Sequence, residues 1–318
     1  MSVRLDALRL RAAVNALFRL YFAERDVLEV ETPILSEAGN TEPNIESFTT
    51  HFTGHVDAGS RLRWMRTSPE FALKRLLAAG VGDCYELGRV FRNGEAGGRH
   101  NPEFTMLEWY RLGWNETMLI DETVGLVRQA LVLVGREASV LSLTYRELFL
   151  QGLGLDPFEA SDAALQEALS GQRVEAQGLT RDDWLDLLIT HRLQPAFPDD
   201  RITVVRDWPA TQCALARVRP GDPPLAERFE LYLGQHELAN GYHELTDAEE
   251  QARRFQHDLA VRERRILSLP PMDHRLIDAL RDGLPACAGV ALGVDRLLMA
   301  LMRTDLISDV LAYDFPRA

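Results

Sequence analysis

The sequence has few cysteines and no long apolar run. Its three cysteines, Cys84, Cys213 and Cys287, are scattered and form no CxxC pair. This spacing argues against a disulfide framework and against a zinc site. Residues 1–22 carry an arginine every few positions, so they match neither a signal peptide nor a membrane span. We therefore expect a soluble, cytoplasmic protein.

Two common nucleotide-binding motifs are also missing, and positive charge is scarce. The segment GVALGVDR is not followed by GK[ST] and does not match GxGxxG, so neither a P-loop nor a Rossmann site fits. The formal net charge is −13, which argues against broad, nonspecific binding to nucleic acid or anionic membranes. A local basic patch remains compatible with this composition.

The composition predicts one folded domain. The chain has 318 residues, of which 46% are hydrophobic, so it can bury a substantial core. No internal repeat, low-complexity tract or flexible linker divides it. Ser161 and Thr180 have the pattern of helix caps, but residues 135–200 contain no catalytic constellation. We predict a single domain over residues 1–318, with a helical insertion at about 135–200.

The most informative stretch is a predicted antiparallel hairpin. Tyr85–Phe91 and Glu103–Tyr110 alternate as strands do, and they flank a loop, Asn93–His100, that contains three glycines. Arg92 can bind a phosphate through two guanidinium nitrogen atoms, and the ring of Phe104 can stack on a base. The hairpin therefore suits a bound nucleotide. An ordinary surface hairpin is the alternative.

A Ser-Pro-Glu triplet precedes the hairpin. Ser68 is predicted to cap a helix whose first position is Pro69, with Glu70 in its first turn and Gly80 at its end. Helix capping alone can explain such a triplet. The same placement puts two polar side chains, those of Ser68 and Glu70, at the mouth of a helix.

A second hairpin is predicted to hold two carboxylates. A turn at Gly234–Gln235 pairs Tyr232 with Glu237, which places Glu230 on the same face as Glu237 at a diagonal of roughly 7 to 8 Å. Such carboxylates repel each other unless a cation lies between them, and Mg²⁺ with nucleotide phosphates would fit. A solvated acidic face is the alternative. A capping box at Thr246–Glu249 is predicted to begin the next helix.

A small-residue segment lies near the C-terminus. Gly289, Ala291 and Gly293 would let a ligand approach the backbone, and Arg296 lies at the start of an apolar helix. A glycine-rich approach to a helix is a weak signal by itself. Its meaning depends on the segments that accompany it.

Three segments, VLEVETP, FRN to HNPEFTMLEWY, and GVALGVDRLLM, together resemble the three signature motifs of class II aminoacyl-tRNA synthetases. The subgroup is that of lysyl-tRNA synthetases, whose catalytic domain has similar SPE, RHNPEFTMLE, ELANG and GVDR segments. The resemblance extends from about Leu8 to Pro316. It implies an α+β fold with a mainly antiparallel sheet flanked by helices, and a homodimer formed through Leu8 to Pro33.

Two departures from lysyl-tRNA synthetases narrow the resemblance. The chain begins almost at the first catalytic helix, so we expect no anticodon-binding domain, and Ala291 stands where those enzymes generally have glycine. With the ELANGYHELTDA segment, these features resemble the family of elongation factor P (R)-β-lysine ligases. That family activates (R)-β-lysine with ATP and Mg²⁺ and transfers it to a lysine ε-amine of elongation factor P. The alternatives are a short lysyl-tRNA synthetase that charges tRNA with α-lysine, and a non-catalytic protein that binds ATP or lysine.

The resemblance also implies a set of ATP contacts. Arg92 would neutralise the α-phosphate, Arg296 would bind the γ-phosphate or stack on adenine, and Glu237 would hold Mg²⁺ with Glu230. These assignments make Arg92, Glu237 and Arg296 the catalytic residues. One position departs from the family pattern, which usually has glutamate after Arg-Asn, whereas here Glu95 follows one residue later. The complete ATP-binding set is Arg92, Asn93, Gly94, Glu95, Asn101, Phe104, Glu237, Leu238, Gly293 and Arg296.

The amino-acid pocket is implied in the same way. Glu244 and Tyr110 would meet the distal ammonium of the substrate, while Ser68 and Glu70 would lie near the other amine. The remaining residues of the predicted pocket are Pro69, Asn240 and Ala291. An ammonium group buried in such a pocket requires a paired carboxylate.

Overall fold

The computed structural model describes residues 4–172 and 178–318. The chain divides into two compact units, which we call unit 1 (Met1–Trp114 with Leu245–Ala318) and unit 2 (Asn115–Glu244). The single domain with a helical insertion at about 135–200 stays a prediction. Residues 173–177 of that insertion lie outside the described residues.

Unit 1 is built on the hairpin that the sequence predicts. Strands β5 (Cys84–Phe91) and β6 (Glu103–Leu112) pair antiparallel, with Val90 opposite Phe104. β12 (Cys287–Gly293) pairs antiparallel with the other edge of β6. β1 (Leu28–Glu29) pairs in parallel with β5. The strand order in unit 1 is therefore β1-β5-β6-β12.

The VLEVETPIL segment, residues 27–35, alternates apolar and acidic residues but contributes to two separate short strands. Only β1 joins the hairpin, and β2 (Leu35–Ser36) belongs to a second, smaller sheet. Pro33 lies between the two strands and has no N–H to donate to a ladder, which accounts for the interruption. The other strands of the smaller sheet are β3 (Thr49–His51) and β4 (Leu62–Met65).

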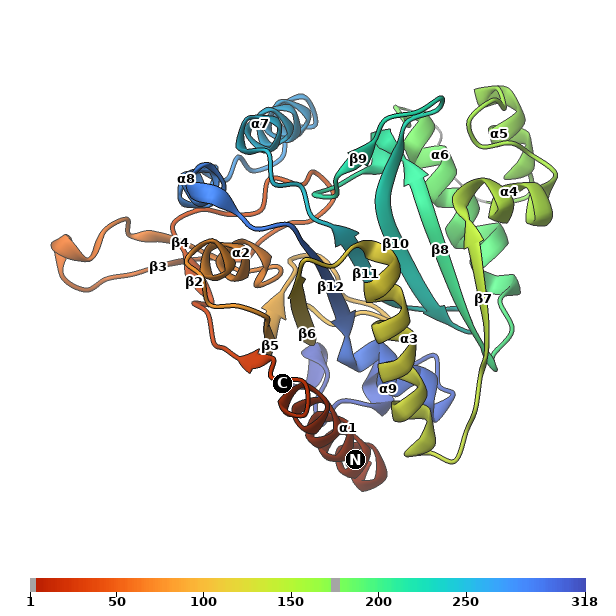
Figure 1. The fold of residues 1–318 in the computed structure, drawn as a ribbon, viewed down its shortest axis with the longest axis horizontal. Helices are drawn as coiled ribbons and strands as arrows, with labels where there is room; N and C mark the ends of the chain where they lie inside the picture. The colour runs from red at the N-terminus through yellow and green to blue at the C-terminus, as the bar shows by residue number, and fades with distance from the viewer. Residues whose placement is uncertain (1–3, 173–177) are drawn as a thin grey trace. The chain divides into compact units, whose positions relative to one another are not determined.

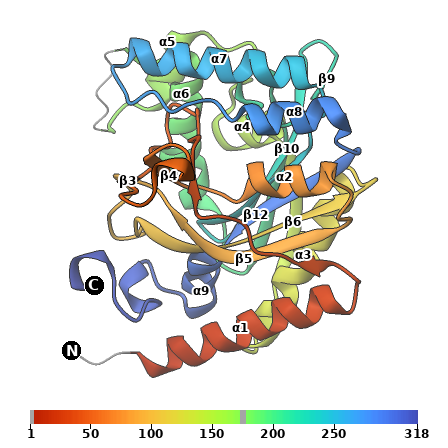
Figure 2. The same ribbon diagram turned by 90° about the vertical axis from the view of Figure 1, so that its left-hand side faces the viewer.

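Helices cover both faces of the unit 1 strands. Figure 2 shows α1 and α9 on one side of β5 and β6, and α2, α7 and α8 on the other. The bounds are α1 Leu5–Ala23, α2 Glu70–Ala78, α7 Ala248–Arg264, α8 His274–Gly283 and α9 Val294–Met302. Short 3₁₀ helices occur at Val56–Ala58, Ile307–Asp309 and Phe315–Arg317.

Unit 2 is a second set of mostly antiparallel strands (Figure 1). The strand order is β11-β10-β8-β7, where only the β7–β8 pair is parallel, and β9 pairs with β10. The bounds are β7 Ser139–Thr144, β8 Arg201–Pro209, β9 Val218–Arg219, β10 Leu225–Leu233 and β11 His236–His243. The mainly antiparallel α+β fold is thus confirmed.

Three of the helices of unit 2 contribute to a buried core that contains an aromatic cluster. Tyr145 and Phe149 of α4 stack at 4.8 Å between ring centroids, and Trp208 of β8 packs against Tyr145. Trp184 of α6 belongs to the same core. The α-helices are α3 Glu116–Val132, α4 Tyr145–Leu153, α5 Asp162–Ala168 and α6 Arg181–Leu188. A π-helical turn follows at Ile189–Leu193, with 3₁₀ turns at Gln194–Ala196 and Ala210–Gln212.

The helix caps show where local sequence is decisive. Ser161 and Thr180 cap α5 and α6 as predicted. The predicted capping box at Thr246–Glu249 is wrong, because Asp247 is the N-cap of α7 and accepts hydrogen bonds from two backbone N–H groups. Among the described helices, none is both long and apolar enough to span a membrane.

Candidate functional site

Arg92 and Phe104 lie together at the tip of the unit 1 hairpin. The guanidinium carbon of Arg92 is 5.2 Å from the centroid of the Phe104 ring. Its Nη1 atom lies 3.7 Å from Oε1 of Glu95, and its Nε atom is buried without a hydrogen bond to any described residue. Arg92 therefore offers a donor for an anion beside an aromatic ring. This arrangement supports the predicted phosphate contact and base stacking.

The loop after Arg92 explains the departure from the family pattern. Gly94 has a φ angle of +84°, a conformation that favours glycine over residues with a Cβ atom. A glutamate at this position would be strained, whereas Glu95 carries its carboxylate back to Arg92. The backbone N–H of Asn93 donates to the carbonyl oxygen of Glu46 at 2.8 Å. The loop is therefore anchored on both sides of Gly94.

Asn101, at the far end of the loop, uses its side chain within the protein. Its Nδ2 donates to the carbonyl oxygen of Glu103 at 2.7 Å, and its Oδ1 accepts from the backbone N–H of Phe315 at 2.8 Å. The amide thus holds the start of β6 against the C-terminal segment. The ATP contact of Asn101 stays a prediction.

Arg296 lies in the first turn of α9, next to the end of the loop. One of its terminal nitrogen atoms is 2.7 Å from Nε2 of His100. Gly293, the last residue of β12, is paired with Met106 of β6. The sheet register therefore brings Arg296 close to the loop that follows Arg92.

A buried carboxyl group lies among the unit 1 residues that are predicted to bind the amino acid. Glu108 of β6 is 2% exposed. Its Oε2 accepts a hydrogen bond from the Ser68 hydroxyl at 2.6 Å, and its Oε1 accepts one from the Tyr110 hydroxyl at 2.8 Å. Ser68 also accepts from the backbone N–H of Glu70 at 3.0 Å, although α2 begins at Glu70, one residue later than predicted. The structure thus joins Ser68 and Tyr110 through a residue that sequence analysis missed.

The environment of Glu108 destabilises its charged form. Burial and the neighbouring charge of Glu70 raise the pKa of Glu108 to about 7, against the opposing effects of the two hydroxyls and of Lys74. Nζ of Lys74 lies 2.7 Å from Oε1 of Glu70. Ala291 of β12 is directly opposite Glu108 in the register, so its methyl group lies on the same face as the carboxyl group. An additional cation at this place would stabilise ionised Glu108.

In unit 2, Glu230 is also a buried carboxyl group with protein partners. Nη2 of Arg228 lies 2.5 Å from its Oε1, and the Tyr232 hydroxyl donates to its Oε2. Burial raises the pKa of Glu230 to about 7, with Glu237 adding to the rise and Arg228 opposing it. The predicted pairing of Tyr232 with Glu237 is confirmed, and a bulge next to Tyr232 places Glu230 opposite Asn240. The mutual repulsion of the two carboxylates remains a reason for a cation here.

The other predicted residues of unit 2 lie on or next to β11. Asn240 accepts a hydrogen bond from Nε of Arg228 at 3.2 Å and donates one to the Tyr242 hydroxyl at 2.9 Å. Leu238 and Glu244 are each 2% exposed. Asn240 is therefore held by the same arginine that pairs with Glu230.

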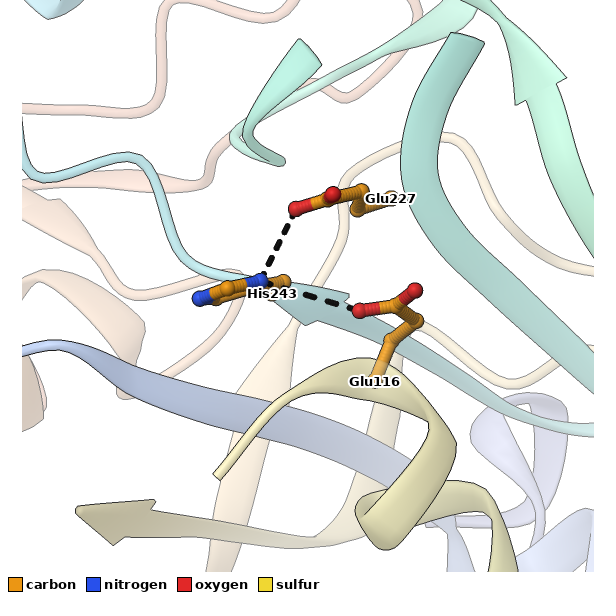
Figure 3. A group of neighbouring side chains, drawn as sticks. All are labelled: Glu116, Glu227 and His243. Atoms are coloured by element: carbon orange, nitrogen blue, oxygen red, sulfur yellow. Dashed lines mark ion pairs between the residues drawn. The ribbon is translucent and has the colours of Figure 1, made fainter. Parts of the chain in front are cut away.

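A separate group in unit 2 has the composition of a metal site. Figure 3 shows His243 between Glu227 and Glu116, with Nδ1 2.8 Å from Oε2 of Glu227 and 3.7 Å from Oε2 of Glu116. Arg217 lies 3.2 Å from Glu227, and Arg219 lies 3.9 Å from it. Both guanidinium groups lie beside Glu227, and Arg219 also pairs with Asp207 at 2.6 Å. Glu227 therefore has cationic neighbours besides His243.

Comparisons with known proteins test the resemblance that the sequence motifs indicate. A family model described as "tRNA synthetases class II (D, K and N)" matches residues 2–317. A protein of Yersinia enterocolitica named elongation factor P–(R)-β-lysine ligase is 47% identical over 311 residues, which are 97% of this chain and 94% of that protein. Proteins with the same name from Vibrio cholerae and Yersinia pestis are each 45% identical, and cover 100% and 95% of this chain and 98% and 93% of their own lengths. These matches confirm the resemblance that the sequence motifs indicate.

The raised pKa of Glu108 predicts a pH-dependent effect of Glu108→Gln. The folded protein keeps a proton on Glu108 up to a pH of about 7, whereas the unfolded chain releases it near the ordinary value of 4.5. The stability from this group is therefore full at low pH and is lost as the pH rises through 7. The thermal unfolding midpoint of Glu108→Gln should rise relative to wild type between about pH 4.5 and pH 7 and should keep a constant offset at higher pH.

The matched control is Glu103→Gln on the same strand, where the glutamate side chain is 52% exposed. Its midpoint should follow that of wild type at a constant offset. A constant offset for Glu108→Gln as well between about pH 4.5 and pH 7 would contradict the inferred protonation of Glu108.

Proposed function

Because the chain belongs to the class II (D, K and N) tRNA synthetase family, we propose that it activates (R)-β-lysine with ATP and transfers it to a lysine ε-amine of elongation factor P. The names of relatives that are 45–47% identical support this substrate. The structural observation that carries the proposal is the buried carboxyl group of Glu108. It accepts hydrogen bonds from Ser68 and Tyr110, and Ala291 is its partner residue in the neighbouring strand.

The first step joins the amino-acid carboxylate to the α-phosphorus of ATP and releases pyrophosphate. A carboxylate with a pKa of roughly 3.5 is already ionised at neutral pH, so it needs no general base. Catalysis then depends on neutralising the phosphates. Arg92, whose buried Nε is not hydrogen-bonded to a described residue, would contact the α-phosphate. Arg296 would bind the γ-phosphate or the adenine, opposite Phe104.

Magnesium fits the carboxyl pair of unit 2. Glu230 is buried, and the charge of Glu237 adds to the rise of its pKa, so a divalent cation would stabilise both carboxylates. Oxygen ligands of this kind suit Mg²⁺. Bound there, Mg²⁺ would neutralise phosphate charge.

The pocket of unit 1 would recognise the amines. An ammonium group that leaves water needs a carboxylate partner. Glu108 is hydrogen-bonded both to Ser68, which is assigned to one amine, and to Tyr110, which is assigned to the other. Ser68, with Glu70, would lie near one amine, and Tyr110 would meet the distal ammonium. The resemblance also assigns Glu244 and Asn240, which belong to unit 2, to the same substrate. The Ala291 methyl group, opposite Glu108, would restrict where the first amine can lie.

The second step forms an amide. The acceptor amine has an ordinary pKa of about 10.4, so it must lose a proton before it attacks the carbonyl carbon of the adenylate. The new C–N bond replaces the C–O bond to phosphate, and AMP leaves. We place the reaction in the cytoplasm because the proposed acceptor is a translation factor.

ATP–pyrophosphate exchange with (R)-β-lysine and with L-α-lysine tests this function without an acceptor. We expect a clear preference for (R)-β-lysine, followed by transfer to elongation factor P. Arg92→Ala should lower the exchange rate by about a hundredfold, which corresponds to roughly 3 kcal/mol of barrier. A preference for L-α-lysine would point to tRNA charging, and no exchange with either would indicate a non-catalytic protein.

Replacing Ala291 with glycine should relax the choice of amine position. Removing one methyl group from a tight pocket typically changes selectivity by roughly tenfold or more. The ratio of kcat/KM for L-α-lysine to that for (R)-β-lysine should rise by about that factor. Ala288→Gly on the opposite face of β12 is the control for strand flexibility. An equal ratio in wild type and Ala291→Gly would remove Ala291 from the specificity argument.

A homodimer through the Leu8 to Pro33 segment is part of the proposal. Two leucines of this segment are unusually exposed for large apolar residues: Leu20 is 59% exposed and Leu28 is 53% exposed. A dimer through this segment would remove these two side chains from water. Sedimentation at micromolar concentration should give twice the mass of the chain, and Leu20→Glu should shift the protein toward monomer. A wild-type monomer would refute the dimer.

A further inference from the structure

Asp295 is a buried carboxylate between two proposed ATP contacts. It immediately precedes Arg296 at the start of α9 and is 1% exposed. Its Oδ2 accepts a hydrogen bond from the backbone N–H of Thr105 at 2.7 Å. Thr105 immediately follows Phe104 on β6. A single carboxylate therefore connects the backbone beside the proposed adenine-stacking ring to the turn that carries the proposed phosphate-binding arginine.

Arg11 of α1 compensates the charge of Asp295. Its Nη2 donates to Oδ1 of Asp295 and, at 3.0 Å, to the carbonyl oxygen of Val310. Nη1 lies 3.5 Å from the Thr105 hydroxyl. The Arg11 side chain is 15% exposed and that of Asp295 is 2% exposed, so water screens this ion pair weakly. The planar guanidinium group reaches three different segments at once, which an ammonium group on a flexible stem does less well.

We propose that Arg11 is a positioning residue for ATP, because its ion pair with Asp295 fixes the spacing between Phe104 and Arg296. The inference rests on the proposed function and extends it to α1, which carries none of the residues assigned to ATP or the amino acid. Without Arg11, Asp295 would be a buried charge with no guanidinium partner at that position, and it would leave the Thr105 N–H or draw in water. The positions of Phe104 and Arg296 would then no longer be fixed relative to each other.

The amino-acid pocket provides an internal comparison. Ser68, Glu108 and Tyr110 are held by their own hydrogen bonds, and none of these involves Arg11 or Asp295. A loss of positioning should therefore weaken ATP binding selectively. A general loss of folding would instead lower the fraction of active enzyme and leave both Michaelis constants unchanged.

The test uses the full chain with Arg11→Met, Arg11→Lys and Arg253→Met. ATP and (R)-β-lysine binding are measured by calorimetry, and their KM values by pyrophosphate exchange, normalised to the adenylate burst. Arg11→Met should raise the KM and Kd for ATP about tenfold, since small misplacements of a reactant are costly, and change those for (R)-β-lysine less than about twofold. Arg11→Lys should restore part of the ATP affinity, because it keeps the charge but not the planar group.

Arg253→Met is the matched control, because Arg253 is an exposed helical arginine that also pairs with a carboxylate, Glu250. It should behave as wild type. If Arg11→Met leaves the KM and Kd for ATP unchanged, or weakens binding of both substrates equally, the positioning role is overturned. The proposed function would survive that result, provided that the wild-type protein binds both substrates. Wild-type protein that binds no ATP would overturn the proposed function and this inference together.

Discussion

A carboxyl group that leaves water must recover its lost hydration from neighbouring donors and cations, and this constraint governs the candidate sites in both units. Glu108 recovers part of it from two hydroxyl groups. Glu230 recovers part of it from Arg228 and a tyrosine hydroxyl. In both cases the recovery is incomplete, because the pKa is raised to about 7. Each group would therefore gain free energy from a cationic ligand, an ammonium in unit 1 and a divalent metal ion in unit 2.

Strand register determines which side chains lie beside the buried carboxyl group of Glu108. Phe104, Glu108 and Tyr110 lie on one face of β6 because side chains alternate along a strand. The opposite face carries Leu107 and Trp109, neither of which is exposed. A slip of one residue would exchange the two faces and bury a carboxylate where an indole now packs. The apolar face thus fixes the position of the polar one, and β12 follows this register when it places Ala291 opposite Glu108.

The features that could be predicted from the sequence are mostly those set by short-range patterns. The alternation around Arg92 and Phe104 was enough to predict β5 and β6, and turn chemistry was enough to pair Tyr232 with Glu237. The prediction of the α7 cap was wrong because two residues that can cap a helix, Thr246 and Asp247, are adjacent in the sequence, and Asp247 is the N-cap. Such a choice depends on how the chain enters the helix, which local propensity does not determine.

Glu108 was missed for a different reason. In the sequence it stands among leucine, tryptophan and tyrosine, where the alternation indicates a core strand. Its proposed role involves Ser68, which lies 40 positions earlier, and Ala291 in a distant strand. A carboxylate at an inward position of an apolar strand was the available signal, because such a group is rarely buried without a partner. Identifying that partner required the fold.

The pairing of Ala291 with Glu108 in the sheet would give the proposed pocket two different means of separating two isomers of lysine. Attraction between an ammonium and a carboxylate falls slowly with distance, so Glu108 favours an amine without choosing between neighbouring carbon atoms. Steric exclusion by a methyl group changes over a fraction of an ångström in a close-packed site. The two residues are opposite each other in the register, so both would act on the same amine of the proposed substrate. The Glu108 carboxylate would select a substrate that carries a positive charge, and the Ala291 methyl group would select the carbon atom of the substrate to which the amine is attached.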